Sequence, residues 1–229
     1  MPAKNVLVID VGGTHVKVGS SDHKDIVKLE SGPAVTPAVM VAAVKKATAG
    51  WEYDAVAIGY PGPVLHGRPV AEPHNLGVGW VGFDFRKAFG KPVKLVNDAA
   101  MQALGSYEGE GKMLFLGLGT GMGSALVVDG VVEPMELAHL PFRKATFEDY
   151  VGESGLERLG KKRWRAAVLE TIETLTSALE PDYVVLGGGN AKKVGELPAN
   201  VRVGSNGDAF TGGFRLWNPS PATSPPAEG

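Results

Sequence analysis

The feature that most constrains this chain is a pattern used three times: a short apolar run that ends in a glycine-rich turn. It occurs at residues 10–14, 117–124 and 186–190. Glycine lets the backbone approach an anion closely and point successive N–H groups at its oxygens. One such turn is commonly nothing more than a turn, but three together indicate phosphate binding. None matches the GxxxxGK[ST] phosphate loop or the GxGxxG dinucleotide motif, which disfavours both of those nucleotide-binding folds.

Two of these turns stand in matching surroundings. Residues 6–10 are a β-branched run, and after the turn residues 15–22 alternate and then turn as a second strand would. Residues 113–118 lead into GTGMGSALVVDG, which repeats the order of apolar strand, glycine turn and apolar strand and then ends in an Asp-Gly hairpin turn. This weak internal duplication predicts two strand-hairpin units in one chain.

The rest of the chain is predicted to alternate between helices and strands. We expect strands at residues 55–59, 93–96 and 183–186, helices at 37–49, 81–89 and 99–104, and mostly helical structure over 148–180. Residues 62–80 are rich in Pro, Gly, His and Asn and are predicted to form a long, shaped loop, a kind of segment that is often functional. Residues 218–229 lack an apolar face and are predicted to form a disordered tail.

Composition excludes several classes of protein. The 25 acidic and 23 basic side chains nearly cancel, so the chain lacks the charge of a nucleic-acid or anionic-membrane binder. The absence of cysteine excludes disulfides, thiolate-bound zinc and a cysteine nucleophile. The N-terminus starts directly on a strand pattern without a signal sequence, and no apolar run is long enough to span a bilayer. We expect a cytoplasmic globular protein with no nucleic-acid or membrane partner.

Asn97 and Asp98 end a predicted strand and open a predicted helix. Transfer of a phosphoryl group to a sugar hydroxyl needs a carboxylate that accepts the hydroxyl proton, and Asp98 is the candidate for this catalytic base. The alternative is a helix N-cap, which Asn and Asp commonly supply. Asp10 has a similar pair of interpretations, as a ligand of hydrated Mg²⁺ beside donor phosphates or as an Asx turn. Thr14 is a candidate for bonding phosphate, whereas Lys17 is expected on the solvent face of its strand.

Three polar residues in the second half of the chain are candidates for sugar recognition. They are Glu136 and His139 in EPMELAHLPF, and Glu148 in TFEDYVG. A carboxylate and an imidazole can together hydrogen-bond adjacent sugar hydroxyls. Metal binding by His139 is the alternative, but with no cysteine and no second histidine at ligand spacing the sequence disfavours it. The remaining histidines receive no catalytic role: His15, His23, His66 and His74.

In their order along the chain these motifs resemble the ROK group of sugar kinases and repressors, and within it the polyphosphate glucokinase branch. The resemblance extends to about Trp217 and rests on DVGGTHVKVG, GYPGPV, HNLGVGW, VNDA, LGLGTGMGSAL, ELAHL, FEDYVG, LGKKRW and VVLGGGNAKK. It implies an α/β protein with the actin-like (ribonuclease H-like) two-lobed fold, in which each lobe is a mixed sheet flanked by helices. We expect the lobes at residues 1–105, with the first phosphate loop and the base, and 106–217, with the second phosphate loop and the sugar-binding segment.

The resemblance also implies roles for individual residues, with Asp98 as the base, and a homodimer as the assembly. The phosphate-binding set would be Gly12, Gly13, Thr14, Gly119, Thr120, Gly121, Gly188 and Gly189. The sugar-binding set would be Gly62, Asn75, Asn97, Asp98, Glu136, His139 and Glu148. Many family members follow the histidine with a cysteine-rich zinc site, but residues 141–152 contain no cysteine, so no zinc is expected. The chain also begins on the first phosphate-loop strand without a helix-turn-helix domain, which disfavours a repressor.

The reaction expected from this likeness is transfer of a phosphoryl group from polyphosphate, ATP or both to the 6-hydroxyl of glucose, with Mg²⁺ as cofactor. The alternatives are an ATP-dependent kinase of mannose or an N-acetylated amino sugar, and a non-catalytic sugar sensor. Polyphosphate would need a basic track whose binding weakens with salt. Candidates for that track, which could equally form a solvated helix face, are Lys144, Lys161, Lys162, Arg163, Arg165, Lys192 and Lys193.

Overall fold

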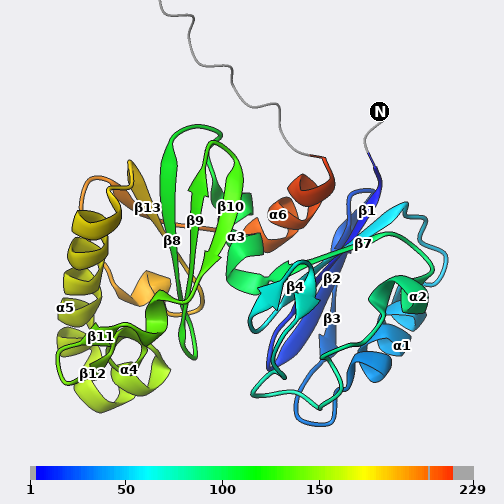
Figure 1. Ribbon diagram of the computed structural model, residues 1–229, viewed down its shortest axis with the longest axis horizontal. Helices are drawn as coiled ribbons and strands as arrows, with labels where there is room; N and C mark the ends of the chain where they lie inside the picture. The colour runs from blue at the N-terminus through cyan, green and yellow to red at the C-terminus, as the bar shows by residue number, and fades with distance from the viewer. Residues whose placement is uncertain (1–3, 206, 219–229) are drawn as a thin grey trace, which may run out of the picture. The chain divides into compact units, whose positions relative to one another are not determined.

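The computed structural model describes residues 4–205 and 207–218, shown in colour in Figure 1. They form two compact units: residues 4–101 with 209–218 make unit 1, and residues 102–205 with 207–208 make unit 2. The boundary therefore differs from the expected division after residue 105. The chain leaves unit 1 within helix α3 (Asp98–Ser106) and returns to it at the start of helix α6 (Asp208–Trp217).

Unit 1 is built on a mixed sheet with strand order β3-β2-β1-β4-β7. Its strands are β1 (Val6–Val11), β2 (His15–Ser20), β3 (His23–Glu30), β4 (Ala55–Tyr60) and β7 (Val93–Asn97). The first three strands form an antiparallel meander, and β4 runs parallel to both β1 and β7. Unit 1 also contains helices α1 (Pro37–Ala47) and α2 (Phe85–Phe89), nearly all of α6, and the hairpin of β5 (Val64–Leu65) and β6 (Arg68–Pro69).

Alternation along β1 directs side chains into two separate cores. Leu7 and Ile9 pack in the core that holds the buried residues of α1 and α2, whereas Val6 and Val8 pack with Phe210 of α6. Figure 1 shows α1 and α2 on one side of this sheet. Because both faces are covered, β1 and β4 are apolar along nearly their whole length, as buried parallel strands usually are.

Unit 2 repeats the same strand order and directions, β10-β9-β8-β13-β14, so the predicted duplication is confirmed. Its strands are β8 (Lys112–Leu118), β9 (Met122–Val128), β10 (Val131–Met135), β13 (Tyr183–Gly187) and β14 (Val201–Val203). Its helical segments are η1 (Leu137–His139), α4 (Phe147–Val151), α5 (Glu153–Leu179) and η2 (Ala191–Lys193), and β11 (Pro141–Phe142) pairs with β12 (Ala145–Thr146). Leu114 and Leu116 of β8 share a core with Trp164 and Ile172 of α5.

Local signals explain where several helices begin and end. Thr36 caps α1 by accepting a hydrogen bond from the Val39 N–H at 3.3 Å. Helix α2 begins at Phe85 rather than at residue 81, because Asp84 is its cap and accepts from the Lys87 N–H at 2.9 Å. Helix α5 is two helices joined at Gly160, whose φ of 71° breaks the helical backbone.

Near its two ends the described chain is held together by hydrogen bonds. Asn218 is tied to Lys4, since its side chain accepts from the Lys4 N–H at 2.8 Å and donates to the Lys4 carbonyl oxygen at 2.9 Å. The rest of the predicted tail, residues 219–229, lies outside the described residues. In the part of the chain that the structure describes, every helix is too short or too polar to cross a membrane.

Candidate active site

The first glycine turn joins β1 to β2 in a tight hairpin. The Gly12 N–H donates to the His15 carbonyl oxygen at 3.0 Å, and a Cβ on Gly12 would lie only 2.9 Å from that oxygen, so this position requires glycine. Gly13 and Thr14 are exposed at the tip, and among residues 4–205 and 207–218 their N–H groups have no hydrogen-bond acceptor. Two successive unsatisfied N–H groups form the kind of concavity that binds a phosphate oxygen.

Asp10 lies just before this turn and faces Lys17 across the hairpin. The Lys17 Nζ is 3.3 Å from the Asp10 Oδ2, and the two side chains are 41% and 13% exposed, respectively. Lys17 was expected on the solvent face of its strand. Its side chain is partly exposed, but it also forms an ion pair with Asp10. Mg²⁺ is often held by one or two carboxylates together with substrate phosphates, and a single half-buried carboxylate beside a phosphate turn fits that pattern. No group of three His, Asp or Glu side chains in the described residues forms a metal site.

The long loop after β4 brings two predicted sugar-binding residues to their partners within unit 1. Asn75 packs on the first glycine turn, where a Cβ added to Gly13 would lie 3.3 Å from the Asn75 Cβ. Gly62 accepts a hydrogen bond at its carbonyl oxygen from the Asn97 Nδ2 at 3.1 Å. The loop thus contacts both the turn and the end of β7.

Glu72, which the sequence analysis did not single out, holds this loop in shape. Its carboxylate accepts hydrogen bonds from the N–H groups of Gly79 and Trp80, both at 3.0 Å, and Val81 at 3.2 Å. Burial and then the negative charge of Glu72 raise the pKa of Tyr60. The available signal was a lone acid in a loop rich in Pro, Gly, His and Asn.

Asn97 and Asp98 divide two roles at the junction of β7 and α3. The Asn97 Oδ1 accepts from the Ala100 N–H at 3.1 Å, which is the N-cap hydrogen bond. Asp98 is the first residue of α3 and half-buried, and its Oδ1 accepts from the Ala99 N–H at 2.8 Å. Because Asn97 caps the helix, capping does not require Asp98.

The second glycine turn joins β8 to β9 in unit 2, and Glu148 from α4 lies against it. The Glu148 Oε2 accepts from the Met122 N–H at 3.1 Å. A Cβ on Gly121 would overlap this carboxylate, so any larger residue there would displace the Glu148 side chain from the turn. Glu148, a candidate for sugar binding by its sequence position, thus also forms a wall of the predicted phosphate turn.

The third glycine turn follows β13 and contacts the second. The Asn190 N–H donates to the Leu118 carbonyl oxygen at 3.0 Å, and the Asn190 Nδ2 donates to the Glu153 Oε2 at 2.6 Å. Gly188 has a φ of 79°, and a Cβ there would overlap the Leu118 carbonyl. Because β8 and β13 are parallel neighbours, both turns leave the same edge of the sheet. Two of the three predicted phosphate turns therefore lie together, and Glu153 is a contact that the sequence did not reveal.

Glu136 and His139, two of the residues that the sequence suggests for sugar recognition, come together at η1. The His139 Nε2 lies 3.5 Å from the Glu136 Oε2, and the side chains are 70% and 57% exposed, respectively. An exposed carboxylate and imidazole that face one another leave their remaining lone pairs and N–H groups available to hydroxyl groups.

The family model for the ROK family matches residues 6–133, which is more than half of the chain. The chain belongs to the ROK family. Among curated relatives, the polyphosphate glucokinase of Mycobacterium tuberculosis is 28% identical over 206 residues, which cover 81% of this chain and 77% of that protein. The match runs through the glycine turns of both duplicated sheets and ends within β10.

Solved structures agree on the fold. The inorganic polyphosphate/ATP-glucomannokinase of Arthrobacter sp. strain KM superposes with a TM-score of 0.80 at 23% identity, over 93% of this chain and 98% of that one. A ROK family glucokinase from Streptomyces griseus, solved with glucose and AMPPNP, gives 0.76 at 17% identity, over 94% of this chain and all of that one (100%). The protein therefore has the actin-like fold of the ROK sugar kinases, as the sequence predicted.

Proposed function

We propose that this ROK protein is a glucokinase that transfers a phosphoryl group from polyphosphate, with ATP as a second donor, to the 6-hydroxyl of glucose. The observation that carries the proposal is the Asp98 carboxylate at the β7–α3 junction, where Asn97 already supplies the helix cap and contacts Gly62. The names of the relatives, a polyphosphate glucokinase and a polyphosphate/ATP-glucomannokinase, support the same substrate classes.

In the proposed reaction Asp98 acts as general base. The glucose O6 forms a bond to the terminal phosphorus as its proton moves to the Asp98 carboxylate. The bond between that phosphorus and the bridging oxygen of the donor breaks, and its electron pair leaves with the shortened polyphosphate or ADP. A base at the first residue of α3 sits on a rigid element, which keeps its position defined.

The donor phosphates are assigned to the glycine turns. In unit 1 the exposed N–H groups of Gly13 and Thr14, with Gly12 behind them, support this assignment. In unit 2 the corresponding residues are Gly119, Thr120 and Gly121, together with Gly188 and Gly189 of the adjoining turn. Backbone N–H groups suit both donors, because they recognise phosphate oxygens and not a base or sugar.

Mg²⁺ belongs to this proposal as the ion that neutralises charge on the donor phosphates during transfer. Asp10 would hold it, with the remaining ligands supplied by water and phosphate. Lys17, at 3.3 Å from Asp10, adds a second positive charge beside the first glycine turn.

Sugar recognition is assigned residue by residue, for each unit by itself. In unit 1 we assign Asn75, Asn97 and the backbone of Gly62 to hydroxyl groups. In unit 2 the facing pair of Glu136 and His139 can bind adjacent hydroxyls, which distinguishes a hexose from an analogue that lacks one. Glu148 uses Oε2 for the Met122 N–H, and we assign its Oε1 to the sugar.

Polyphosphate as donor is supported by exposed cations on unit 2. Lys161, Lys162 and Arg163 are exposed and follow the break at Gly160, so they open the second part of α5. Cations are unfavourable at a helix N-terminus, and a local cost of this kind is often kept for function. Arg165 is less available, since its Nη2 donates to the Glu196 carbonyl oxygen at 3.1 Å. A cytoplasmic location and a homodimer complete the proposal, and sedimentation equilibrium tests the latter.

The decisive experiment is a coupled glucose 6-phosphate assay that compares ATP with long-chain polyphosphate, run on the wild type and on Asp98→Asn. We expect Asp98→Asn to lower kcat by about a thousandfold or more while glucose binding by calorimetry persists, because loss of a base affects the transition state alone. Asp25→Asn, an exposed acid on β3, is the matched control and should keep full activity. Near-normal turnover of Asp98→Asn would refute the assignment of the base, and a sugar panel including mannose tests the acceptor.

A further inference from the structure

Unit 1 contains a cavity of about 700 Å³ that no catalytic assignment uses. Its walls are the tip of the β5–β6 hairpin (residues 66–69), the segment that starts α2 (residues 82–86) and strand β7 from Val93 to Val96. None of the residues of the first glycine turn lines it. Its volume is in the range of cavities that bind small molecules.

The cavity follows the open edge of the sheet of unit 1. Strand β7 is the last strand of this sheet, with β4 on one side and, within residues 4–205 and 207–218, no strand on the other. The hairpin bends over that open edge, because a Cβ on Gly67 would lie 3.9 Å from the Leu95 carbonyl oxygen. His66 forms the turn with a φ of 50°, a left-handed backbone that few residues other than glycine adopt. The hairpin thus presents His66 and Arg68 at the cavity.

Charge in this cavity is strongly unbalanced. Arg68, Arg86 and Lys94 line it with only one carboxylate, that of Asp84, which already accepts the capping N–H of Lys87. In the described residues neither arginine has a carboxylate partner. Lys94 donates to the Leu216 carbonyl oxygen at 2.6 Å and lies 4.7 Å from the centre of the Trp217 ring, so its partners are neutral. Among the described residues, Arg68 and Arg86 therefore line this cavity without a carboxylate partner.

The walls between the cations are apolar. Phe83 and Phe85 meet edge to face, with ring centres 4.8 Å apart, and Pro69 is buried beside them. An inorganic ion alone would not need such walls, whereas the C–H faces of a sugar pack on aromatic and proline rings. Arginine binds phosphate through two parallel hydrogen bonds. We propose that this cavity is a second ligand site, separate from the glycine turns, that binds a phosphate monoester such as a sugar phosphate.

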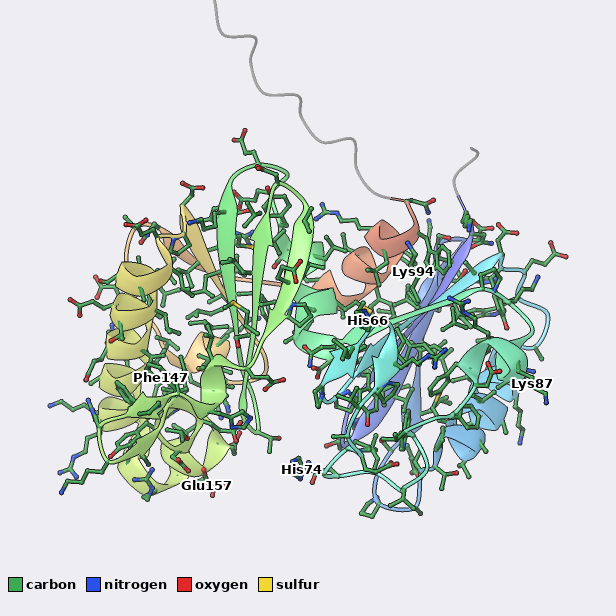
Figure 2. All side chains as sticks on the ribbon, viewed as in Figure 1. His66, His74, Lys87, Lys94, Phe147 and Glu157 are labelled. Carbon is green, nitrogen blue, oxygen red and sulfur yellow. The ribbon has the colours of Figure 1, made fainter. Side chains whose placement is uncertain are left out.

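The test uses Arg68→Gln/Arg86→Gln in the full-length protein, with Lys87→Gln as the matched control. Lys87 is an exposed cation on the same helix that does not line the cavity, and Figure 2 labels it together with His66 and Lys94. Calorimetry at low salt would follow glucose 6-phosphate, inorganic phosphate and tripolyphosphate in parallel. We expect the double variant to lose one binding event, with affinity at least about tenfold weaker, because two charge-assisted contacts are removed. Glucose, which is uncharged, should bind as in the wild type.

The three anions distinguish the source of the phosphate. Tighter binding of glucose 6-phosphate than of phosphate assigns a sugar phosphate, and equal binding assigns the phosphate group alone; both support an anion site. Hydrogen exchange of the wild type, measured with and without these anions, gives a readout that depends on no variant. We expect the anions to slow exchange at residues 64–69 and 93–96. The proposal is overturned if the double variant binds all three anions as the wild type does, if Lys87→Gln weakens them equally, or if these segments gain no protection.

Discussion

The two sheets of this protein have one topology but use their glycine turns differently. Asp10 lies opposite Lys17 in the hairpin of unit 1, whereas Gly117 lies opposite Gly123 at the corresponding place in unit 2. Unit 2 instead receives its carboxylate from Glu148, which lies 26 residues along the chain from Met122, the residue it contacts. The same backbone frame therefore carries a charged pair built into the hairpin on one side, and a neutral hairpin with an acid delivered by a helix on the other.

The largest effect is expected when one charge of the Asp10–Lys17 pair in unit 1 is removed. Asp10→Asn should lower kcat/KM by about a hundredfold, because the carboxylate proposed to hold Mg²⁺ beside the donor phosphates is lost. Lys17→Gln should instead lower the Mg²⁺ concentration needed for half-maximal rate, because a competing cation is removed from Asp10. Rates measured across a Mg²⁺ titration distinguish the two variants. Identical Mg²⁺ curves for wild type and Asp10→Asn would remove Asp10 from the ion site.

In the second glycine turn we expect added side-chain volume, and not a change of charge, to have the larger effect. Gly121→Ala would force Glu148 away from the turn and break its bond to the Met122 N–H, at a cost of about 1–3 kcal/mol in the free energy of unfolding. Gly119→Ala is the matched control, since a Cβ at Gly119 meets no atom within 4 Å. Urea denaturation gives both values.

A double-mutant cycle isolates this contact. In a Glu148→Ala background the cost of Gly121→Ala should fall, because the clashing carboxylate is gone. An undiminished cost would mean that the strain at residue 121 lies in the backbone and not against Glu148.

Much of this frame could be predicted from sequence, because it depends on local patterns. The apolar runs before each glycine turn gave β1, β8 and β13, and the Asp-Gly pair gave the hairpin turn after β9, where Asp129 has a φ of 48° and Gly130 of 80°. Strand β3 was not predicted, because most of it is exposed and its charged residues hide the alternation. What separates strand from loop there is pairing with β2, which no short window contains.

The candidate site was predictable in its residues but not in its contacts. Asp98 and Asn97 could each have been the cap, and only the hydrogen bond from the Ala100 N–H assigns it to Asn97. Glu148 contacts Met122, and Glu72 contacts residues 79–81 later in its own loop. Neither pair of contacts has a fixed spacing along the sequence. Side-chain contacts of this kind depend on packing between elements, so pattern alone does not reveal them.

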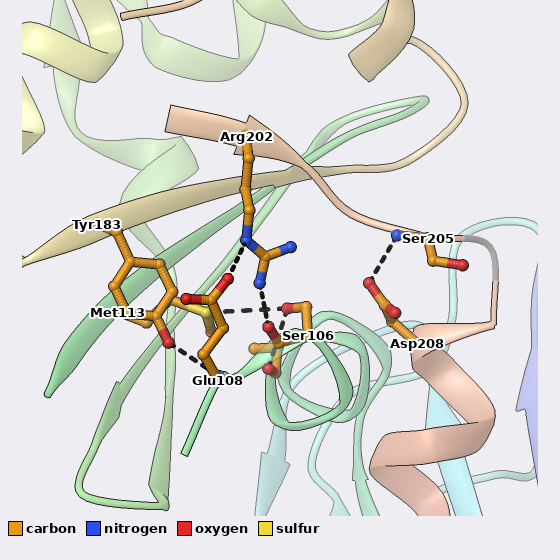
Figure 3. A network of polar contacts seen from close by, with 8 residues as sticks. Ser106, Glu108, Met113, Tyr183, Arg202, Ser205 and Asp208 are labelled. Atoms are coloured by element: carbon orange, nitrogen blue, oxygen red, sulfur yellow. Dashed lines mark hydrogen bonds and ion pairs between the residues drawn. The ribbon is translucent and has the colours of Figure 1, made fainter. Parts of the chain in front are cut away.

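The last strand of each sheet carries a basic residue that donates to a carbonyl oxygen near the C-terminus of a helix, and the two residues have different numbers of partners. Lys94, second in β7, reaches the Leu216 carbonyl near the end of α6, and Arg202, second in β14, reaches the Ser106 carbonyl at the end of α3 (Figure 3). Arg202 also pairs with Glu108 at 2.7 Å. Cations suit helix C-termini because they meet unpaired carbonyls and the negative end of the dipole.

Replacing each residue by alanine should show which of them contributes more to the free energy of unfolding. Arg202→Ala should lower the free energy of unfolding by about 1–2 kcal/mol and Lys94→Ala by about 1 kcal/mol or less, because arginine loses two partners and lysine one hydrogen bond. Lys87→Ala, exposed on α2, should change it by less than about 0.5 kcal/mol. A larger loss for Lys94→Ala than for Arg202→Ala would contradict the ranking.

The smallest expected effect concerns how unit 2 positions Glu148. Helix α4, which carries it, starts with a capping box in which Thr146 and Asp149 bond one another's backbone N–H groups. The hydrogen bonds from the Thr146 hydroxyl and N–H, followed by the charge of Arg158, lower the pKa of Asp149. A carboxyl with a lowered folded-state pKa stabilises the fold above its unfolded pKa, and that contribution is lost as the pH falls through the folded value. Thr146→Ala should therefore raise the pKa of Asp149 toward its ordinary value in an NMR titration and weaken α4 chiefly at neutral pH, while an unmoved pKa would show that the cap does not fix this helix.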